Sequence, residues 1–513
     1  MYSKCGSMVE ARRVFDGLER NTHDAVSWTA LMFGYVENKQ ELQALELFVS
    51  MAKVCRPNAR AFVVALKACT RVAANEGGKV VAGDTIVKVR ALENGMEIHR
   101  RAATDGFDKN TIVSNAVVEM YAQCGSLVDA RAVLDRMVEH DEASWNALLL
   151  GYSQSGEQEL ALELFELLSS SGRSGGRPAY AAALKCCAEL AAKEDGRTVD
   201  GKLVKLGSLG KVMRIHSQAV KIELDSDRFL ASALVDTYAK CGSVLDARRV
   251  FDSMVLEGQD DLVLWTSIML AHADNGEGRV TLELFSRIKS QPWWSPRDPQ
   301  TMVAALKASG SSEVASLESA RRIHAEACRH GLIERDEALA SCLVDAYGRL
   351  GRSGDSQQVF DSIPVKDPLT WTALVAGYSR VGDPELVFRW FRKMVDEKII
   401  PDAIACVCVL AACSHAGLVD RGREFVREME AKFGIKPDIR HYSCVIDMLG
   451  RANRLEEGLA MAETMPVDPN AVTWTTLLGA CAKWKNATLG KIAFERSRQT
   501  HPSNFQLMAN IYA

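Results

Sequence analysis

The sequence lacks the features that mark several protein classes. Its 14 cysteines include no pair with the Cys-x-x-Cys spacing of zinc sites, and they are sparse for 513 residues, so free thiols in a reducing compartment are expected. No apolar run reaches the ~18 residues that a membrane-spanning helix needs. Positive charge is not in excess, because 62 Lys and Arg face 66 Asp and Glu and give a net charge of −4. A uniformly basic protein that coats nucleic acid is therefore excluded.

Motifs of enzymes are also missing. Gly77-Gly78-Lys79 has neither the spacing nor the hydroxyl of a phosphate-binding loop. His324-Ala-Glu326 matches the first half of the zinc-deaminase signature, but the second half, Pro-Cys-x-x-Cys, is absent. His99 and His216 stand at equivalent places without a Glu two residues later. We interpret the three histidines as structural helix residues and expect no catalytic residue, no metal site and no cofactor.

Internal repetition dominates the chain. A motif that begins with Trp occurs five times, 103 to 120 residues apart, at Trp28-Thr-Ala-Leu31, Trp145-Asn-Ala-Leu148, Trp265-Thr-Ser-Ile268, Trp371-Thr-Ala-Leu374 and Trp474-Thr-Thr-Leu477. Two further series lie between these copies, one like Tyr121-Ala-Gln-Cys-Gly125 and one like Leu66-Lys-Ala-Cys69. Each interval thus holds three units of roughly 31 to 36 residues, a period that predicts a stacked solenoid.

Each unit has the periodicity of two helices. Trp145, Leu148 and Tyr152 fall at i, i+3 and i+7, and the pattern resumes at Ala161 after a glycine. The spacing predicts antiparallel helices that meet at a left-handed glycine, with Asn38 in that place in the first Trp-headed unit. The expected fold class is all-α, a right-handed α-solenoid superhelix. The tryptophans are interpreted as core residues rather than stacking platforms, because their neighbours share the core spacing.

Domain organisation follows from the units. Residues 1–470 are expected to form about thirteen alternating repeats, the first one truncated, and residues 471–513 a truncated terminal repeat, because both ends interrupt a helical pattern. Two long units carry extra segments, at about residues 75–93 and 193–211. We expect these segments to bulge as loops or to lengthen a helix hairpin.

The repeated segments resemble a known family. Trp145-Asn-Ala-Leu-Leu-Leu-Gly-Tyr152 with Ala161-Leu-Glu-Leu-Phe165, and the run from Tyr238 to Phe251, closely resemble pentatricopeptide repeat proteins. The alternation resembles their plant subclass of standard, long and short repeats, and the segment from 471 is similar to its extension motif. The resemblance implies binding of single-stranded RNA in a mitochondrion or chloroplast, with one base read per repeat. It further implies that the protein selects sites for cytidine-to-uridine editing or processing, with deaminase activity supplied by a further domain or by a partner in trans.

Small polar residues recur at two positions of the units. A residue that follows a core position lies ~100° around the helix and can face a groove. In the standard and short units this residue is Thr29, Asn115, Asn146, Ser232, Thr266, Ser341, Thr372 and Ser443, and the unit ends carry Asn58, Asp141, Asp261, Asp298, Asp367, Asp402 and Asn470. Helix capping would explain the unit ends but not the position after Trp. In the resembled family the two positions form the base-reading pair, whereas the long units here have the apolar residues Val63, Ala181, Val303 and Val407.

A protein-binding α-solenoid scaffold of the tetratricopeptide type is the alternative from another functional class. Diverse polar residues after the core position would favour a scaffold. The restriction to Ser, Thr and Asn favours RNA instead. The net negative charge does not exclude RNA, because a line of Lys and Arg in the groove can hold phosphates while the outer face stays acidic.

The pairing rule of the resembled family gives a testable sequence. A hydroxyl with Asp implies guanine, a hydroxyl with Asn adenine and Asn with Asp uracil, while Asn146 lacks a clear partner and implies only a pyrimidine. From 5′ to 3′ the chain then reads A-x-U-pyrimidine-x-G-G-x-G-G-x-A. Substituting Thr266→Asn should shift one position from guanine toward uracil by ~1–3 kcal/mol. Gel-shift titration with singly substituted RNAs measures this, and an equal loss of affinity for every RNA would mean that Thr266 only supports the fold.

Overall fold

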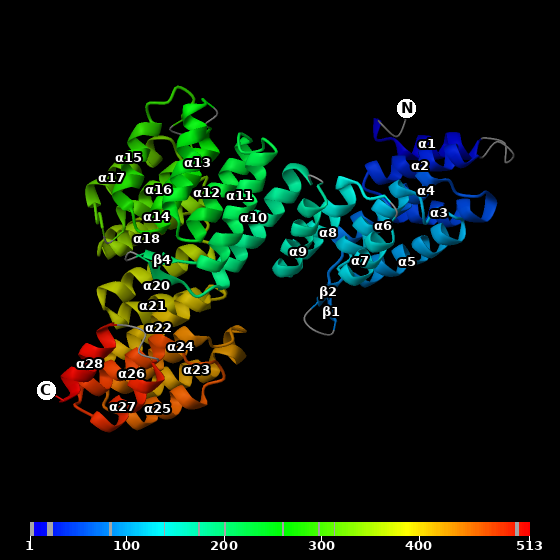
Figure 1. Ribbon diagram of the computed structural model, residues 1–513. Coiled ribbons are helices and arrows are strands. Elements are labelled where there is room, and N and C mark those ends of the chain that lie inside the picture. The colour runs from blue at the N-terminus through cyan, green and yellow to red at the C-terminus, as the bar shows by residue number, and fades with distance from the viewer. Residues whose placement is uncertain are drawn as a thin grey trace. The chain divides into compact units, whose positions relative to one another are not determined.

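The computed structural model describes residues 5–17, 24–81, 85–137, 139–172, 175–199, 202–258, 261–295, 298–311, 313–497 and 502–512. These residues form 28 α-helices and two small sheets, so the predicted all-α class is confirmed. They divide into two compact units, Met1–Ala271 and His272–Ala513. Figure 1 shows the helices of each unit arranged as consecutive pairs.

The helices alternate between two roles within the pairs. The first helix of each pair is α2 (Ala25–Glu37), α4 (Ala59–Asn75), α6 (Thr111–Gln123), α8 (Glu142–Gln154), α10 (Gly176–Lys193), α12 (Arg228–Lys240), α14 (Leu262–Asp274), α16 (Pro299–Ser309), α18 (Glu337–Arg349), α20 (Pro368–Val381), α22 (Ala403–Ala416), α24 (Ile439–Arg451) and α26 (Ala471–Lys483), and α28 (Pro502–Tyr512) follows the last pair. The second helix is α3 (Glu41–Val54), α5 (Val89–Thr104), α7 (Leu127–Arg136), α9 (Gln158–Ser170), α11 (Leu206–Lys221), α13 (Val244–Leu256), α15 (Gly278–Ile288), α17 (Leu317–Arg329), α19 (Ser353–Ser362), α21 (Pro384–Asp396), α23 (Val419–Phe433), α25 (Leu455–Thr464) and α27 (Ala487–Arg496), and α1 (Met8–Asp16) precedes the first pair.

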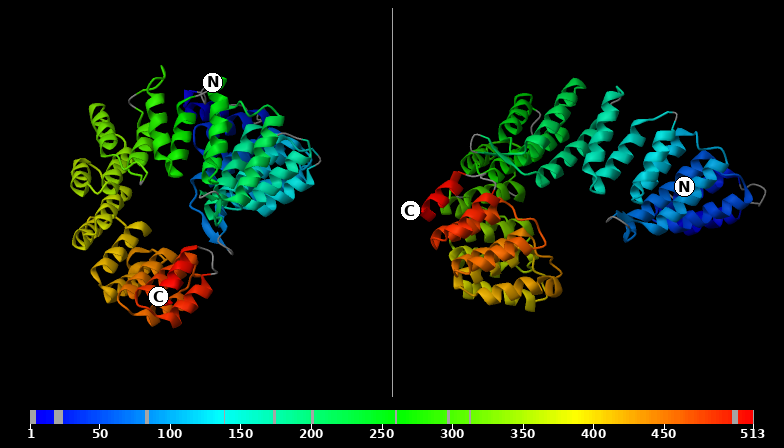
Figure 2. Two further views of the ribbon diagram at one scale, coloured as in Figure 1. Left: turned by 60° about the vertical axis from the view of Figure 1, so that its left-hand side comes forward. Right: turned by 60° about the horizontal axis from the view of Figure 1, so that its bottom comes forward.

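Stacking of the pairs follows one rule in each unit. From α2 to α10 and from α16 to α24, a first helix packs on its own second helix and on the next first helix along the chain, and α26 packs on α27 and α28. A single amphipathic hairpin cannot bury its apolar face alone, so the stack creates a continuous core. The two directions of Figure 2 show the successive hairpins of the second unit, coloured green to red. The result is a row of adjacent first helices, which is the α-solenoid expected from the repeats.

The tryptophans hold successive hairpins together. Phe15, Phe251 and Phe360 each belong to the helix that precedes a Trp-bearing first helix, and they meet that Trp edge to face, with ring centroids 4.8, 5.0 and 4.8 Å apart. Such edge-to-face pairs add stability beyond the buried area. Trp265 and Trp371 are fully buried, as expected for core residues. Trp145 is only half-buried, and the helix before it has Leu134 where α1, α13 and α19 have Phe.

The left-handed turn of the first Trp-headed unit differs from expectation. Gly156 has a φ of +83° at the end of its first helix, as predicted. In the first unit, however, Asn38 has a φ of −95°, and the next residue, Lys39, takes the left-handed conformation with a φ of +57°. The Asn38 amide instead donates to the carbonyl of Gly34 at 2.8 Å. The prediction for Asn38 was therefore wrong by one residue, because its side chain closes the helix as a donor.

The two inserted segments are β-hairpins, which corrects the expectation of loops or longer helices. β1 (Lys79–Val81) pairs antiparallel with β2 (Thr85–Val87), and β3 (Arg197–Val199) pairs with β4 (Lys202–Val204). The hairpins join α4 to α5 and α10 to α11, and Figure 1 labels β1, β2 and β4.

Equivalent contacts fix the base of each β-hairpin. The Glu76 carboxylate accepts the amide of Arg90 at 2.9 Å, and the Glu194 carboxylate accepts the amide of Ser208 at 2.8 Å. The amides of Lys88 and Lys205 donate to the carbonyls of Cys124 and Cys241 at 3.0 and 2.9 Å. Each insertion is thus clamped to the helix that follows it and to the turn of the next hairpin, which orders strands of only three residues.

Docking of the second β-hairpin predicts a difference between two glycines. Gly242 and Gly156 both have left-handed φ values, but a Cβ on Gly242 would lie 2.1 Å from the Leu203 carbonyl oxygen, whereas one on Gly156 would meet nothing within 4 Å. Gly156→Ala should cost about 1–2 kcal/mol from backbone strain. Gly242→Ala should cost ~1–3 kcal/mol more from overpacking. Urea unfolding followed by circular dichroism measures both, and equal losses would contradict the docking of β4.

Candidate nucleic-acid interface

The unit-end Asp and Asn residues begin the first helices. Asn58 accepts the amide of Ala61 at 2.8 Å, and Asp402 accepts that of Ala405 at 2.8 Å. The same N-cap is made by every predicted unit-end residue, namely Asn58, Asp141, Asp261, Asp298, Asp367, Asp402 and Asn470. Capping is therefore one role of these residues. Because the cap fixes the side chain at the helix start, it also places a polar group beside the preceding first helix.

The pair Asn115 and Asp141 shows this second consequence. Asn115 Nδ2 donates to Asp141 Oδ2 at 2.5 Å, while Asp141 Oδ1 accepts the Ser144 amide at 3.0 Å. One carboxylate thus caps α8 and holds a residue of α6. Partial burial raises the pKa of Asp141, but hydrogen bonds from Ser144 and Asn115 lower it more, so its pKa lies below the usual value. The carboxylate is ionised at neutral pH and fixes the orientation of the Asn115 amide.

Hydroxyl residues meet their predicted partners in the second unit. Thr372 Oγ1 donates to Asp402 Oδ1 at 3.1 Å. Ser341 Oγ lies 3.3 Å from Asp367 Oδ1 and also 2.8 Å from the carbonyl of Glu337 in its own helix. Ser443 reaches its partner through one residue, because its Oγ lies 3.2 Å from Thr473 Oγ1, which donates to Asn470 Oδ1 at 3.1 Å.

Three other predicted readers bond their own helices. Thr29 donates to the carbonyl of Ala25 at 2.5 Å, Ser232 to Arg228 at 3.0 Å and Thr266 to Leu262 at 2.8 Å. Among the described residues, no hydrogen bond joins Thr29 to Asn58 or Ser232 to Asp261. Thr266 belongs to the first unit and Asp298 to the second. The sequence pattern therefore placed the residues on the right helix ends, but it did not foresee which pairs touch.

Asn146 has a backbone partner. Its Nδ2 donates to the carbonyl of Gly175 at 3.0 Å. Gly175 is the N-cap residue of α10, so it occupies the place that Asp or Asn fills elsewhere. No partner was predicted for Asn146 because glycine has no side chain that a sequence pattern could reveal.

Two reader amides keep a buried atom without a partner. Within the part of the chain that the structure describes, Oδ1 of Asn115 and Oδ1 of Asn146 are buried and accept no hydrogen bond. A buried polar atom left unpaired costs about 1–3 kcal/mol, and such an atom calls for an explanation. Since the other end of each amide is held in place, these oxygens form fixed acceptors that a ligand donor can satisfy.

A row of exposed apolar residues escaped the sequence analysis. Three residues before a reader, and so on the same face one turn earlier, large apolar side chains are 60 to 66% exposed at Val26, Ile112, Phe229, Val263 and Leu369. A single exposed apolar side chain needs no explanation, but recurrence at a fixed offset does. The available signal was a large apolar residue two positions before the core residue in these five units, where the core spacing does not require one.

Another polar pair was missed near the C-terminus. Thr475, the residue after Trp474, donates to Asn504 Oδ1 at 3.1 Å. Thr475 has the same offset from its Trp as Thr29 or Thr372, and that offset was the signal. It was overlooked because residues 471–513 were assigned to a terminal motif.

The three repeated histidines make structural contacts. Their Nδ1 atoms lie 2.9 to 3.0 Å from tyrosine hydroxyls in the pairs His99–Tyr121, His216–Tyr238 and His324–Tyr347. Burial lowers the pKa of each of these imidazoles, which favours the neutral form.

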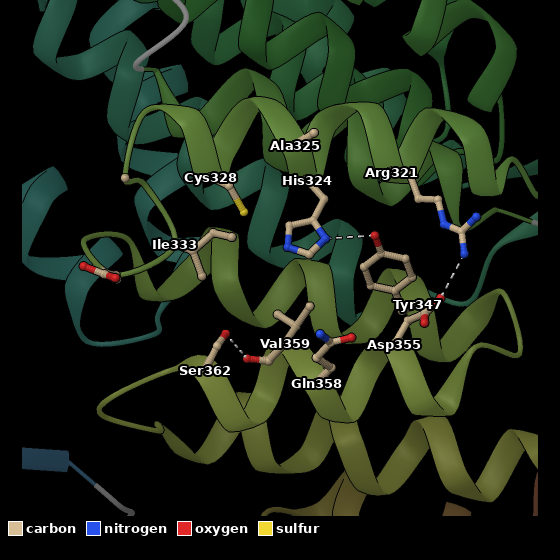
Figure 3. Close-up of a pocket in the computed structure, with 12 residues that line it drawn as sticks. Arg321, His324, Ala325, Cys328, Ile333, Tyr347, Asp355, Gln358, Val359 and Ser362 are labelled. Carbon is tan, nitrogen blue, oxygen red and sulfur yellow. Dashed lines mark hydrogen bonds and ion pairs between the residues drawn. The ribbon is translucent and has the colours of Figure 1, made fainter.

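His324 lines a cavity of about 620 Å³ between α17, α18 and α19, which Figure 3 shows with Arg321 and Asp355 beside it. Glu326, the other residue of the half-signature, pairs instead with Lys289 at 2.6 Å. In the described ranges, no three His, Cys, Asp or Glu side chains gather as a metal site. None of the described helices has the length and apolar character to span a bilayer.

Comparison with known proteins identifies the family. The chain aligns over its whole length with the putative pentatricopeptide repeat-containing protein At3g15130 of Arabidopsis thaliana, with 31% identity and 69% of that protein covered. The chain belongs to the pentatricopeptide repeat family. The model of the PPR repeat matches residues 26–54, 112–141, 143–173, 230–259 and 369–399.

Further relatives agree with this assignment. The pentatricopeptide repeat-containing protein At5g16860 of the same plant is 32% identical, and the chain spans 61% of its length. Among solved structures, the pentatricopeptide repeat protein PPR10 from maize has a TM-score of 0.60 at 15% identity, covering 100% of this chain and 80% of that one. At that identity the likeness to PPR10 concerns the fold alone.

The double role of Asp141 leads to a prediction. In Asp141→Asn the amide oxygen can keep the cap, so unfolding free energy should change by less than about 1 kcal/mol. The NH₂ group of the side chain introduced at position 141 would face the NH₂ group of Asn115, and two donors cannot bond each other. The Asn115 amide should therefore flip, so that its NH₂ takes the place of its Oδ1. A site that accepted the N3–H of uracil should then prefer cytosine, whose N3 is an acceptor.

Asp227 provides the matched control. It caps α12 by accepting the Leu230 amide at 2.9 Å, but its long unit has Ala181 at the reading position. Asp227→Asn should therefore leave base preference unchanged. Fluorescence anisotropy with RNAs that differ at one base measures both variants, and an unchanged preference in Asp141→Asn would contradict a reading role for this pair.

Proposed function

We propose that this pentatricopeptide repeat protein binds single-stranded RNA along its first helices and reads one base in each standard or short unit. The contact between Asn115 and Asp141 carries the proposal. It holds the Asn115 amide in place and leaves its buried Oδ1 without a hydrogen-bond partner among the described residues. Unstacked bases present their edges to such fixed polar groups in sequence-specific RNA recognition.

The surroundings of the readers suit a nucleotide. The exposed apolar side chains one turn earlier, such as Val263 and Leu369, can pack against the faces of a base. Basic residues end the first helices of the second unit, at Arg349, Arg380, Arg451 and Lys483. These cations can neutralise phosphates although the whole chain has a net charge of −4. The site thus offers groups for the edge, the face and the phosphate of a nucleotide.

The base-reading pairs follow the sequence expectation. Thr29 with Asn58 and Ser443 with Asn470 should read adenine, and Asn115 with Asp141 uracil. Guanine is assigned to the pairs Ser232 with Asp261, Thr266 with Asp298, Ser341 with Asp367 and Thr372 with Asp402. At Asn146 the fixed acceptor suits a base with a donor on its edge, such as the N4 amine of cytosine or the N3–H of uracil.

The proposed biological role is the selection of organellar RNA sites for cytidine-to-uridine editing or for processing. Relatives of this chain are named chloroplastic and mitochondrial, At1g11290 and At2g03380 respectively, which supports one of these organelles. PPR10 was solved in complex with an 18-nt psaJ RNA element, which supports RNA as the ligand. For editing, deaminase chemistry would come from a further domain or from a partner in trans, because the residues of this chain offer no deaminase signature.

A binding experiment tests the proposal. The RNA A-N-U-C-N-G-G-N-G-G-N-A should bind at least tenfold more tightly than an RNA in which the four guanines are replaced by cytosine, since each mismatch costs ~1–3 kcal/mol. The affinity should fall as salt rises, because phosphate contacts release counterions. Anisotropy titrations at two salt concentrations provide both measurements. Equal affinity for the two RNAs would overturn base reading, and no RNA binding at all would favour the protein-binding scaffold.

A further inference from the structure

We infer that the C-terminal hairpin α26–α27, closed by α28, contains an additional base-reading site formed by Thr475 and Asn504. This inference rests on the proposed function and extends it by one nucleotide. Thr475 follows the core residue Trp474, and its hydroxyl donates to Asn504 Oδ1 at 3.1 Å. The contact joins α26 to α28, just as the contact of Thr372 with Asp402 joins α20 to α22.

Asn504 supplies the second observation. Its side chain is completely buried, and Nδ2 has no hydrogen-bond partner among the described residues. Because Oδ1 is held by Thr475, the free Nδ2 is a fixed donor. A buried donor without a partner is costly in a purely structural role. Asn115 and Asn146 also have a buried atom without a partner, but there it is the acceptor Oδ1.

The helix around this pair repeats the other parts of a reading site. Val472, three residues before Thr475, is 63% exposed. Lys483 lies in the last turn of α26, as Arg380 and Arg451 lie in the last turns of α20 and α24. The hairpin also continues the array, since α26 packs on α24 and Ile511 of α28 joins the core with Trp474 and Leu477.

Asn504 differs from the other unit-end partners in position. It is the third residue of α28, whereas Asn470 directly precedes α26. In the preceding site the residue at this third position, Thr473, already contacts the reader Ser443 at 3.2 Å. The terminal site therefore uses a position that borders the reader in its neighbour, with an amide in place of a hydroxyl.

The groups of the pair indicate the base. The Thr475 hydroxyl proton is engaged by Asn504, so Oγ1 is left as an acceptor beside the Nδ2 donor. Adenine offers the complementary edge, with N6–H for Oγ1 and N1 for Nδ2. The neighbouring pair Ser443 and Asn470 combines the same two functional groups, and adenine is proposed there as well. The additional base lies one nucleotide 3′ of the base read by Ser443.

The test varies two adjacent RNA positions in the full chain. One RNA series changes the base assigned to Ser443, and a second series changes the next base on the 3′ side. The wild type should prefer adenine in the second series by about tenfold over the weakest base. Thr475→Val should remove this preference, and Asn504→Asp, which replaces the donor by an acceptor, should shift it from adenine toward guanine. Both variants should keep the discrimination in the first series.

Thr476→Val is the matched control. Thr476 is the adjacent residue on the same helix, but its hydroxyl bonds the Val472 carbonyl at 2.9 Å, so its loss should leave both series unchanged. Discrimination in the first series without discrimination in the second would overturn the inference while the proposed function stands. Absence of discrimination in both series would overturn the two together. Circular dichroism melting of each variant checks folding, and Asn504→Asp remains informative if Thr475→Val is destabilised.

Discussion

The side-chain caps that begin the first helices, with α10 and its Gly175 as an exception, determine where the proposed reading positions stand. A helix leaves its first amide groups without partners, so an Asp or Asn at that point is favoured for reasons of folding alone. Stacking of first helices then places this cap against the preceding first helix. At Asp141 one carboxylate oxygen accepts the backbone amide of Ser144, and the other accepts the side-chain amide of Asn115. Under the proposed function, folding and recognition would depend on the same residue, so capping and base reading are compatible interpretations of Asp141.

Neighbouring positions of the first helices require side chains of different size. Trp265 and Trp371 must be large because each fills the space beside a Phe of the preceding second helix. The residue after the core position must be small, because it lies where two first helices meet and is nearly buried at Ser341, which follows Ala340, and at Thr372, which follows Trp371. A large side chain there would separate the helices. Packing thus restricts this position to small side chains, including Val and Ala in the long units, and Ser, Thr and Asn add the donors and acceptors that the proposed reading requires.

Structural features that recur along the chain could be predicted from the sequence, whereas features that occur once or twice were missed. The helices and the Trp core follow from a pattern present in every unit. The β-hairpins were missed because three-residue strands such as β3 carry little signal of their own, and their order comes from Glu76 and Glu194, whose contacts lie eleven or more residues away. The Gly175 partner of Asn146 is a backbone carbonyl, which no side-chain pattern reveals. Asn504 was missed because it stands three residues beyond the usual place in the unit.

The spacing of the first helices constrains the form of the RNA. Packed helices lie about 8–10 Å apart, whereas stacked nucleotides in a duplex strand rise only about 3.4 Å per base. A strand that presents one base to each first helix must therefore be stretched and unstacked, which a duplex cannot be. Bases that are unstacked lose the stacking contacts between their faces. The exposed apolar residues one turn before the readers, such as Val263 and Leu369, can replace those contacts, so a single strand is the form of RNA that this row of helices suits.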